Sequence, residues 1–149
     1  MVYTRNESNV GTRYFALVLG VLYLLIGVMG LIPGLLQVPS PPDPVAIDTL
    51  HGDLLGIFPV NIVHTLVHLA VGLWGIMAYR RYDSAIGFAR AIGVLFGLLF
   101  LMGLIPGARV MFGLAPLHGA DVWLHLATSL AGLYFGFVAP RTTDSAGAD

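Results

Sequence analysis

Two histidines and an aspartate stand in the segment HGADVWLH, residues 118–125, of an otherwise strongly apolar chain. His118, Asp121 and His125 have the spacing i, i+3 and i+7, which places them on one face of a helix. A carboxylate beside an imidazole commonly fixes a histidine tautomer or supports a histidine that binds a metal. The pattern therefore indicates either a hydrogen-bonded polar cluster or a metal site.

A second segment, NIVHTLVH at residues 61–68, carries a comparable pattern. Asn61, His64 and His68 also fall on one face of a helix. His64 and His68 are four positions apart, the spacing by which one helix offers two ligands to one metal ion. The two segments together hold four of the chain's five histidines, so they are the place to look for chemistry.

The elements that carry these residues must be membrane helices. Of the 149 residues, 57% are hydrophobic and only 10% are charged, against about a quarter charged in soluble domains. A transmembrane helix needs about 20 apolar residues. We predict an all-α polytopic membrane protein, an antiparallel bundle of four transmembrane helices at about 14–33, 59–79, 84–106 and 116–139.

The distribution of arginines predicts the orientation. All seven basic residues are arginine, and six of them fall on one side of the four-span topology, with Arg109 alone on the other. By the positive-inside rule both termini face the cytoplasm, in an inner or plasma membrane. Residues 1–12 are then a short cytoplasmic segment, 13–140 the transmembrane domain and 141–149 a disordered cytoplasmic tail.

Composition also excludes several classes of function. A net charge of −1 without a basic cluster gives no case for nucleic-acid binding. Without cysteine the chain has no disulfides, thiolate metal sites or iron–sulfur clusters. We find no nucleophile–base pair and no phosphate-binding loop, so the sequence makes no positive case for an enzyme.

The sequence contains a repeat of two helices. MGLIPG occurs at residues 29–34 and again at 102–107, and GIFPVNIVHTLVHLA at 56–70 aligns with GLAPLHGADVWLHLA at 113–127. The chain therefore reads as two tandem hairpins related by a pseudo-two-fold axis along the membrane normal. Matched residues should lie at equal depth, namely His68 with His125, His64 with Asp121, Asn61 with His118, and Pro59 with Pro116 in the first turns of the second and fourth helices.

The cost of burying charge in lipid places the polar residues inside the bundle. An ionisable side chain at a helix centre costs roughly 2.5–3.5 kcal/mol on insertion scales, and less near the interface. We therefore expect a His/Asp cluster between the second and fourth helices, near the extracytoplasmic face. An ionisable residue within a membrane span is by default a candidate functional site.

The segments PVNIVHTLVHLAVG (59–72) and PLHGADVWLHLA (116–127) resemble a family of bacterial four-span membrane proteins known as a domain of unknown function. The resemblance rests on the patterns Asn-x-x-His-x-x-x-His and His-Gly-x-Asp-x-x-Leu-His. It implies a four-helix membrane protein with these polar residues in its signature. It implies no activity.

Several functions remain open from the sequence. The cluster could be a structural lock in a non-enzymatic scaffold or accessory subunit, which would contact the bilayer and a membrane protein partner or a second copy. It could bind zinc, iron or copper through His64, His68, Asp121 and His125, with Asn61 and His118 around them. His68 and His125 could instead ligate haem, or the site could bind a quinone. Proton transport is less favoured, because we expect no polar residues in the cytoplasmic halves of the spans.

Overall fold

The computed structural model describes residues 4–39 and 44–139, and the predicted tail at 141–149 lies outside them. The fold is mostly helical. Four α-helices follow one another along the chain: α1 (Thr4–Gly30), α2 (Ile62–Ala78), α3 (Tyr82–Leu104) and α4 (Ala120–Leu133), the last extended by a π-helical turn at Tyr134–Val138.

Three of these helices are long and apolar enough to cross a membrane. The apolar stretches are Val10–Gly30, Tyr82–Leu104 and Ala120–Val138. The remaining helix, α2, is apolar but has only 17 residues, which is about 25 Å at 1.5 Å per residue. The predicted second span of 59–79 is therefore too long. The chain therefore has several apolar helices that are long enough to span a membrane.

The first helix begins well before the predicted span. We expected a span at 14–33 preceded by a short cytoplasmic segment, but α1 already starts at Thr4. Hydropathy detects the part of a helix that lipid can cover, whereas hydrogen bonding continues the helix into the polar region. The end of the predicted span is also wrong, because α1 stops at Gly30, before Pro33.

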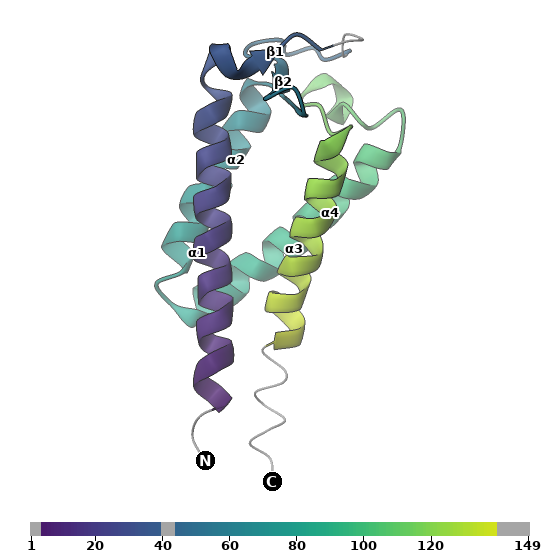
Figure 1. The fold of residues 1–149 in the computed structure, drawn as a ribbon. Coiled ribbons are helices and arrows are strands. Elements are labelled where there is room, and N and C mark those ends of the chain that lie inside the picture. The colour runs from purple at the N-terminus through teal and green to yellow at the C-terminus, as the bar shows by residue number, and fades with distance from the viewer. Residues whose placement is uncertain (1–3, 40–43, 140–149) are drawn as a thin grey trace.

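The helices form two antiparallel pairs. α1 packs mainly against α2, and α3 packs mainly against α4. Only three residues separate α2 from α3, and α3 runs obliquely behind α1 and α4 (Figure 1). The start of α1 and the end of α4 lie at the same end of the molecule, here called the terminal end (Figure 1).

Glycines allow close backbone contact within each pair. A Cβ on Gly75 of α2 would lie 2.7 Å from the Ala16 carbonyl oxygen and 2.8 Å from the Cα of Gly20. A Cβ on Gly132 of α4 would lie 2.6 Å from the backbone nitrogen of Gly93 on α3. Small residues at such contacts let helices associate by van der Waals packing, which is the main source of helix association in lipid.

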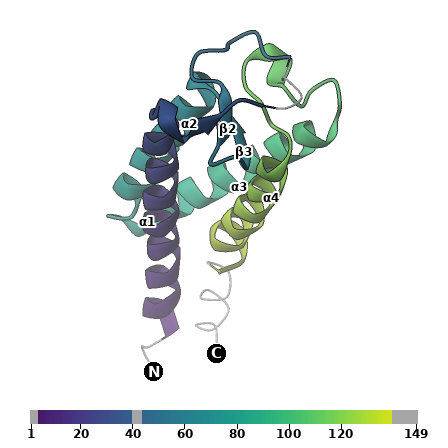
Figure 2. The same ribbon diagram turned by 45° about the horizontal axis from the view of Figure 1, so that its top comes forward.

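A small antiparallel sheet covers the other end, and the expectation of an all-α fold is wrong in this respect. After a 3₁₀ turn at Pro33–Leu35, the strands are β1 (Leu36–Gln37), β2 (Gly52–Leu54) and β3 (Phe58–Val60) (Figure 2). β2 is central and pairs with both neighbours. Strands of two or three residues are too short to show an alternating sequence pattern.

Both helices that carry the polar segments begin later than predicted. Pro59, expected in a first helical turn, lies in the edge strand β3 instead. The helix starts at Ile62 because the Asn61 side chain accepts a hydrogen bond from the His64 N–H and so caps it. Pro116 likewise precedes α4, whose N-cap is Gly119 at φ +65° and ψ −138°.

The two connections at the sheet end join each other over the helices. We call the described residues 44–60 and 105–119 together the cap. The backbone N–H of Ala46 donates to the Gly113 carbonyl at 2.8 Å. Four non-glycine residues in the cap have left-handed φ angles, a conformation that strains side-chain-bearing residues: Leu50, Leu55, Met111 and Phe112.

Candidate metal centre

Four polar side chains lie buried just beneath the cap. His64 and His68 come from the first two turns of α2, and Asp121 and His125 from the first two turns of α4. Their exposed fractions are 4%, 2%, 1% and 1% respectively. These residues lie directly under the cap because α2 and α4 begin only a few residues before them.

The three histidines form one compact cluster. One ring nitrogen from each of His64, His68 and His125 lies within 4.8 Å of the others. Asp121 is beside them: its Oδ2 is 3.3 Å from Nε2 of His125 and 3.7 Å from Nε2 of His64. His68 thus meets His125, and His64 meets Asp121, as the alignment of the two segments predicts.

Most polar atoms of this cluster have no hydrogen-bond partner in the described part of the chain. These atoms are Nδ1 of His64, both ring nitrogens of His68, Nδ1 of His125 and both carboxylate oxygens of Asp121. Buried polar atoms are normally satisfied, and leaving one unsatisfied costs about 1–3 kcal/mol. The cluster therefore brings together several donor atoms that could act as ligands.

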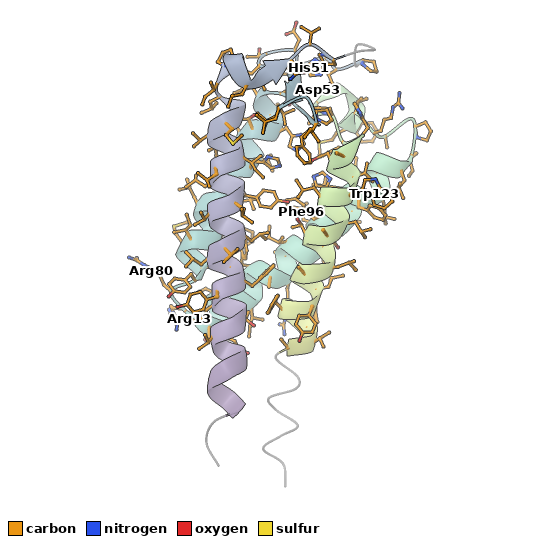
Figure 3. All side chains as sticks on the ribbon, in the orientation of Figure 1. Arg13, His51, Asp53, Arg80, Phe96 and Trp123 are labelled. Atoms are coloured by element: carbon orange, nitrogen blue, oxygen red, sulfur yellow. The ribbon has the colours of Figure 1, made fainter. Side chains whose placement is uncertain are left out.

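Aromatic rings from the other two helices pack against the cluster. Tyr23 of α1 meets the His68 ring edge-on at 5.0 Å and 80°, and Phe96 of α3 meets the His125 ring at 5.1 Å and 79°. Figure 3 shows Phe96 in the middle of the bundle, between α1 and α4. The Tyr23 hydroxyl also shares a buried 2.8 Å hydrogen bond with Thr128 of α4.

Buried hydroxyl groups continue from the cluster to the middle of the bundle. Besides Tyr23 and Thr128, Ser129 is buried and donates to the Gly93 carbonyl, and Thr12 is buried near the terminal end. These residues do not stand out in the sequence, because hydroxyl groups carry no charge and are common in apolar helices. An apolar layer separates Thr12 from the other hydroxyls; its residues include Ala16, Phe88 and Ile92.

The comparison with known proteins gives a family. Residues 13–138 match the family described as a domain of unknown function, DUF4383. The chain belongs to this family. No curated protein and no solved structure is significantly similar to the chain.

In this DUF4383 domain, Asn61 supports the cluster from the cap side. Its side-chain amide donates to the carbonyls of Ile47 and Leu114, at 2.9 and 2.7 Å, while its Oδ1 accepts from the His64 N–H at 3.0 Å. Asn61 therefore holds both connections of the cap and the first turn of α2. His118 was also expected beside the cluster. It is half-buried, whereas Asn61 is buried, and it lies outside the three-histidine group.

Replacing Asn61 with alanine should destabilise the protein by about 2–4 kcal/mol, from one lost cap and two unsatisfied carbonyls. Asn61→Ser is the matched control, because serine can still cap the helix but cannot make both donations. Unfolding in detergent, followed by circular dichroism, should rank wild type above Asn61→Ser and Asn61→Ser above Asn61→Ala. Equal stability of all three proteins would contradict this role.

Proposed function

We propose that this protein is a membrane scaffold in which a transition-metal ion joins the two helical hairpins. The ligands are His64 and His68 from the first hairpin, and Asp121 and His125 from the second. The observation that carries the proposal is the group of three buried histidines with ring nitrogens within 4.8 Å of one another.

The unsatisfied atoms favour a metal over a purely structural lock. In a purely structural cluster, histidine and aspartate would hydrogen-bond to one another. Asp121 Oδ2 does lie 3.3 Å from Nε2 of His125, but neither ring nitrogen of His68 has a hydrogen-bond partner in the described residues. Four ligands around a metal at about 2.0–2.1 Å are about 3.3 Å apart. The three histidine nitrogens lie within 4.8 Å of one another and Asp121 lies beside two of them, so the side chains would move closer together on binding.

The ligand set favours zinc, with iron or copper as alternatives. Three imidazole nitrogens and one carboxylate oxygen suit these borderline metals, and four ligands match the tetrahedral preference of zinc. All four side chains are buried, and four protein ligands leave no open position on a tetrahedral ion. Such a ligand set suits a structural ion.

Haem fits this cluster less well. A haem iron between His68 and His125 would need the macrocycle to lie between the two rings. His64 occupies that neighbourhood, with its ring centroid 4.4 Å from that of His68 and 6.0 Å from that of His125. Tyr23 and Phe96 pack against the same two histidines. The surroundings support a single ion.

Elemental analysis of purified protein tests the proposal. We expect about one transition-metal ion per chain in protein prepared in mild detergent, because all four ligands serve a single site. Asp121→Asn should reduce the metal content several-fold, whereas His51→Ala should not, because His51 lies in the cap outside the cluster. A parent protein without metal, also after incubation with zinc and removal of excess, would refute the proposal. A Soret band would instead indicate haem.

We also propose that the two hairpins are copies related by a pseudo-two-fold axis along the membrane normal. Contacts that recur at matched positions support this. The pairs are Gly20–Gly75 with Gly93–Gly132, Ala16–Gly75 with Ala89–Gly132, and Tyr23–His68 with Phe96–His125. A duplication would explain why each hairpin supplies two ligands.

Four transmembrane spans with both termini in the cytoplasm remain part of the proposal. Figure 3 shows Arg13 and Arg80 toward the terminal end. Arg81 adjoins Arg80, and Arg90 donates to the Gly136 carbonyl in the last turn after α4, whereas Asp48, Asp53 and Arg109 belong to the cap. The positive-inside rule then puts the terminal end in the cytoplasm and the cap outside. The metal cluster accordingly lies near the extracytoplasmic face.

A further inference from the structure

Two arginines near the terminal end make the same pair of contacts, one in each hairpin. The Nε–H of Arg13 on α1 donates to the Tyr79 carbonyl at 2.8 Å, and the Nε–H of Arg90 on α3 donates to the Gly136 carbonyl at 2.8 Å. Arg13 also lies over the Tyr79 ring, 5.0 Å from its centroid, and Arg90 over the Phe137 ring at 5.1 Å. A hydrogen bond and a cation–π contact thus hold each guanidinium in one orientation.

The carbonyl groups that accept these two hydrogen bonds stand at matching positions of the two hairpins. The arginines that donate them do not. Gly136 is the residue that matches Tyr79 when His125 is aligned with His68. In the alignment of the two MGLIPG segments, Arg13 matches Ile86, one helical turn before Arg90. The same contact is therefore made from two different positions, which points to a role for the arranged guanidinium itself.

Each guanidinium has donors left for a ligand. The contact to the carbonyl uses one of its five N–H groups. Within the described residues neither arginine has an ion pair, and the terminal nitrogens have no hydrogen-bond partner. Arg13 is half-buried and Arg90 is exposed, so both reach the surface that lipid covers.

We propose that each of these two guanidiniums binds the phosphate of an anionic phospholipid in the leaflet at the terminal end. A guanidinium offers two parallel N–H donors that match two phosphate oxygens, and a charged side chain near the end of a span extends toward the headgroups. Arg13 and Arg80 lie toward this same end of the molecule (Figure 3), and their positive charge attracts anionic headgroups. This inference is independent of the metal centre.

Native mass spectrometry from nanodiscs of phosphatidylglycerol and phosphatidylcholine tests the proposal. The parent protein should retain two phosphatidylglycerol molecules. Arg13→Lys and Arg90→Lys should each lower retention of one of them about fivefold or more, because lysine keeps the charge but loses the planar fork. Arg109→Lys in the cap is the matched control and should retain both.

Four results would overturn the proposal in whole or in part. Equal loss in Arg109→Lys would indicate general charge attraction, and equal retention of phosphatidylcholine would indicate no headgroup preference. Displacement of the lipid by excess inorganic phosphate would identify free phosphate as the ligand. Phe137→Leu keeps Arg90 and removes only its ring contact. This variant tests the Arg90 site even if the arginine variants do not fold. Full retention by a folded Phe137→Leu protein would also contradict the Arg90 site.

Discussion

His68→Ala protein is expected to contain no bound metal and to unfold about 5–10 °C below the parent. An ion held at a hundred times its dissociation constant stabilises the folded state by about 2.7 kcal/mol. One kcal/mol shifts the melting temperature of a chain of this size by about 2–4 °C. His68 is chosen because neither of its ring nitrogens has another partner in the described chain, so its removal should act mainly through the ion.

A chelator separates this effect from lost packing. EDTA should lower the melting temperature of the parent toward that of His68→Ala and leave the variant unchanged, as thermal scans in detergent would show. His51→Ala should behave like the parent in both conditions. If chelation left the parent's melting temperature unaltered although it removed the metal, the ion would not join the hairpins as proposed.

Gly132→Ala is expected to destabilise the second hairpin by about 1–3 kcal/mol, at the upper end of that range because the clash is with backbone. The new methyl group would lie 2.6 Å from the Gly93 nitrogen, 2.8 Å from its Cα and 2.9 Å from the Ala89 carbonyl oxygen. Only separation of α3 from α4 relieves such contacts. In lipid no hydrophobic gain compensates for the lost packing.

Gly87→Ala on α3 is the matched control. A Cβ at Gly87 has no neighbouring atom within 4 Å, so alanine should be neutral or stabilise the helix by up to about 1 kcal/mol. Both variants can be compared by denaturant unfolding in mixed micelles. Equal stability of Gly132→Ala and Gly87→Ala would show that the close contact between α3 and α4 is unimportant.

The sequence predicted the cluster because charge is expensive in lipid. His64, His68, Asp121 and His125 stand out in apolar helices, and the alignment of the two segments gave their pairing. Tyr23 was not predicted, since a tyrosine in a membrane helix faces lipid or protein with nearly equal ease. Only the packed structure shows its hydroxyl bonded to Thr128.

The boundaries of the elements were predicted less well, for local reasons. Pro59 favours a helix start, but Asn61 is the better N-cap and sets the start of α2. Gly119 similarly sets the start of α4 through a backbone conformation that glycine readily adopts. The sheet escaped notice because its strands depend on pairing between distant segments, as in Leu36 with Leu54.

The cluster takes two residues from each hairpin, so it forms in two steps as the chain is synthesised. α1 and α2 can pair as soon as both have left the ribosome, because their glycine contacts lie within the first hairpin. In the proposed topology His64 and His68 are then already in the membrane, while Asp121 and His125 are still to be translated. Until α4 is in place, these two imidazoles lack the Asp121 and His125 side chains beside them. A nascent chain that stalls there therefore exposes two imidazoles that α4 covers in the finished protein.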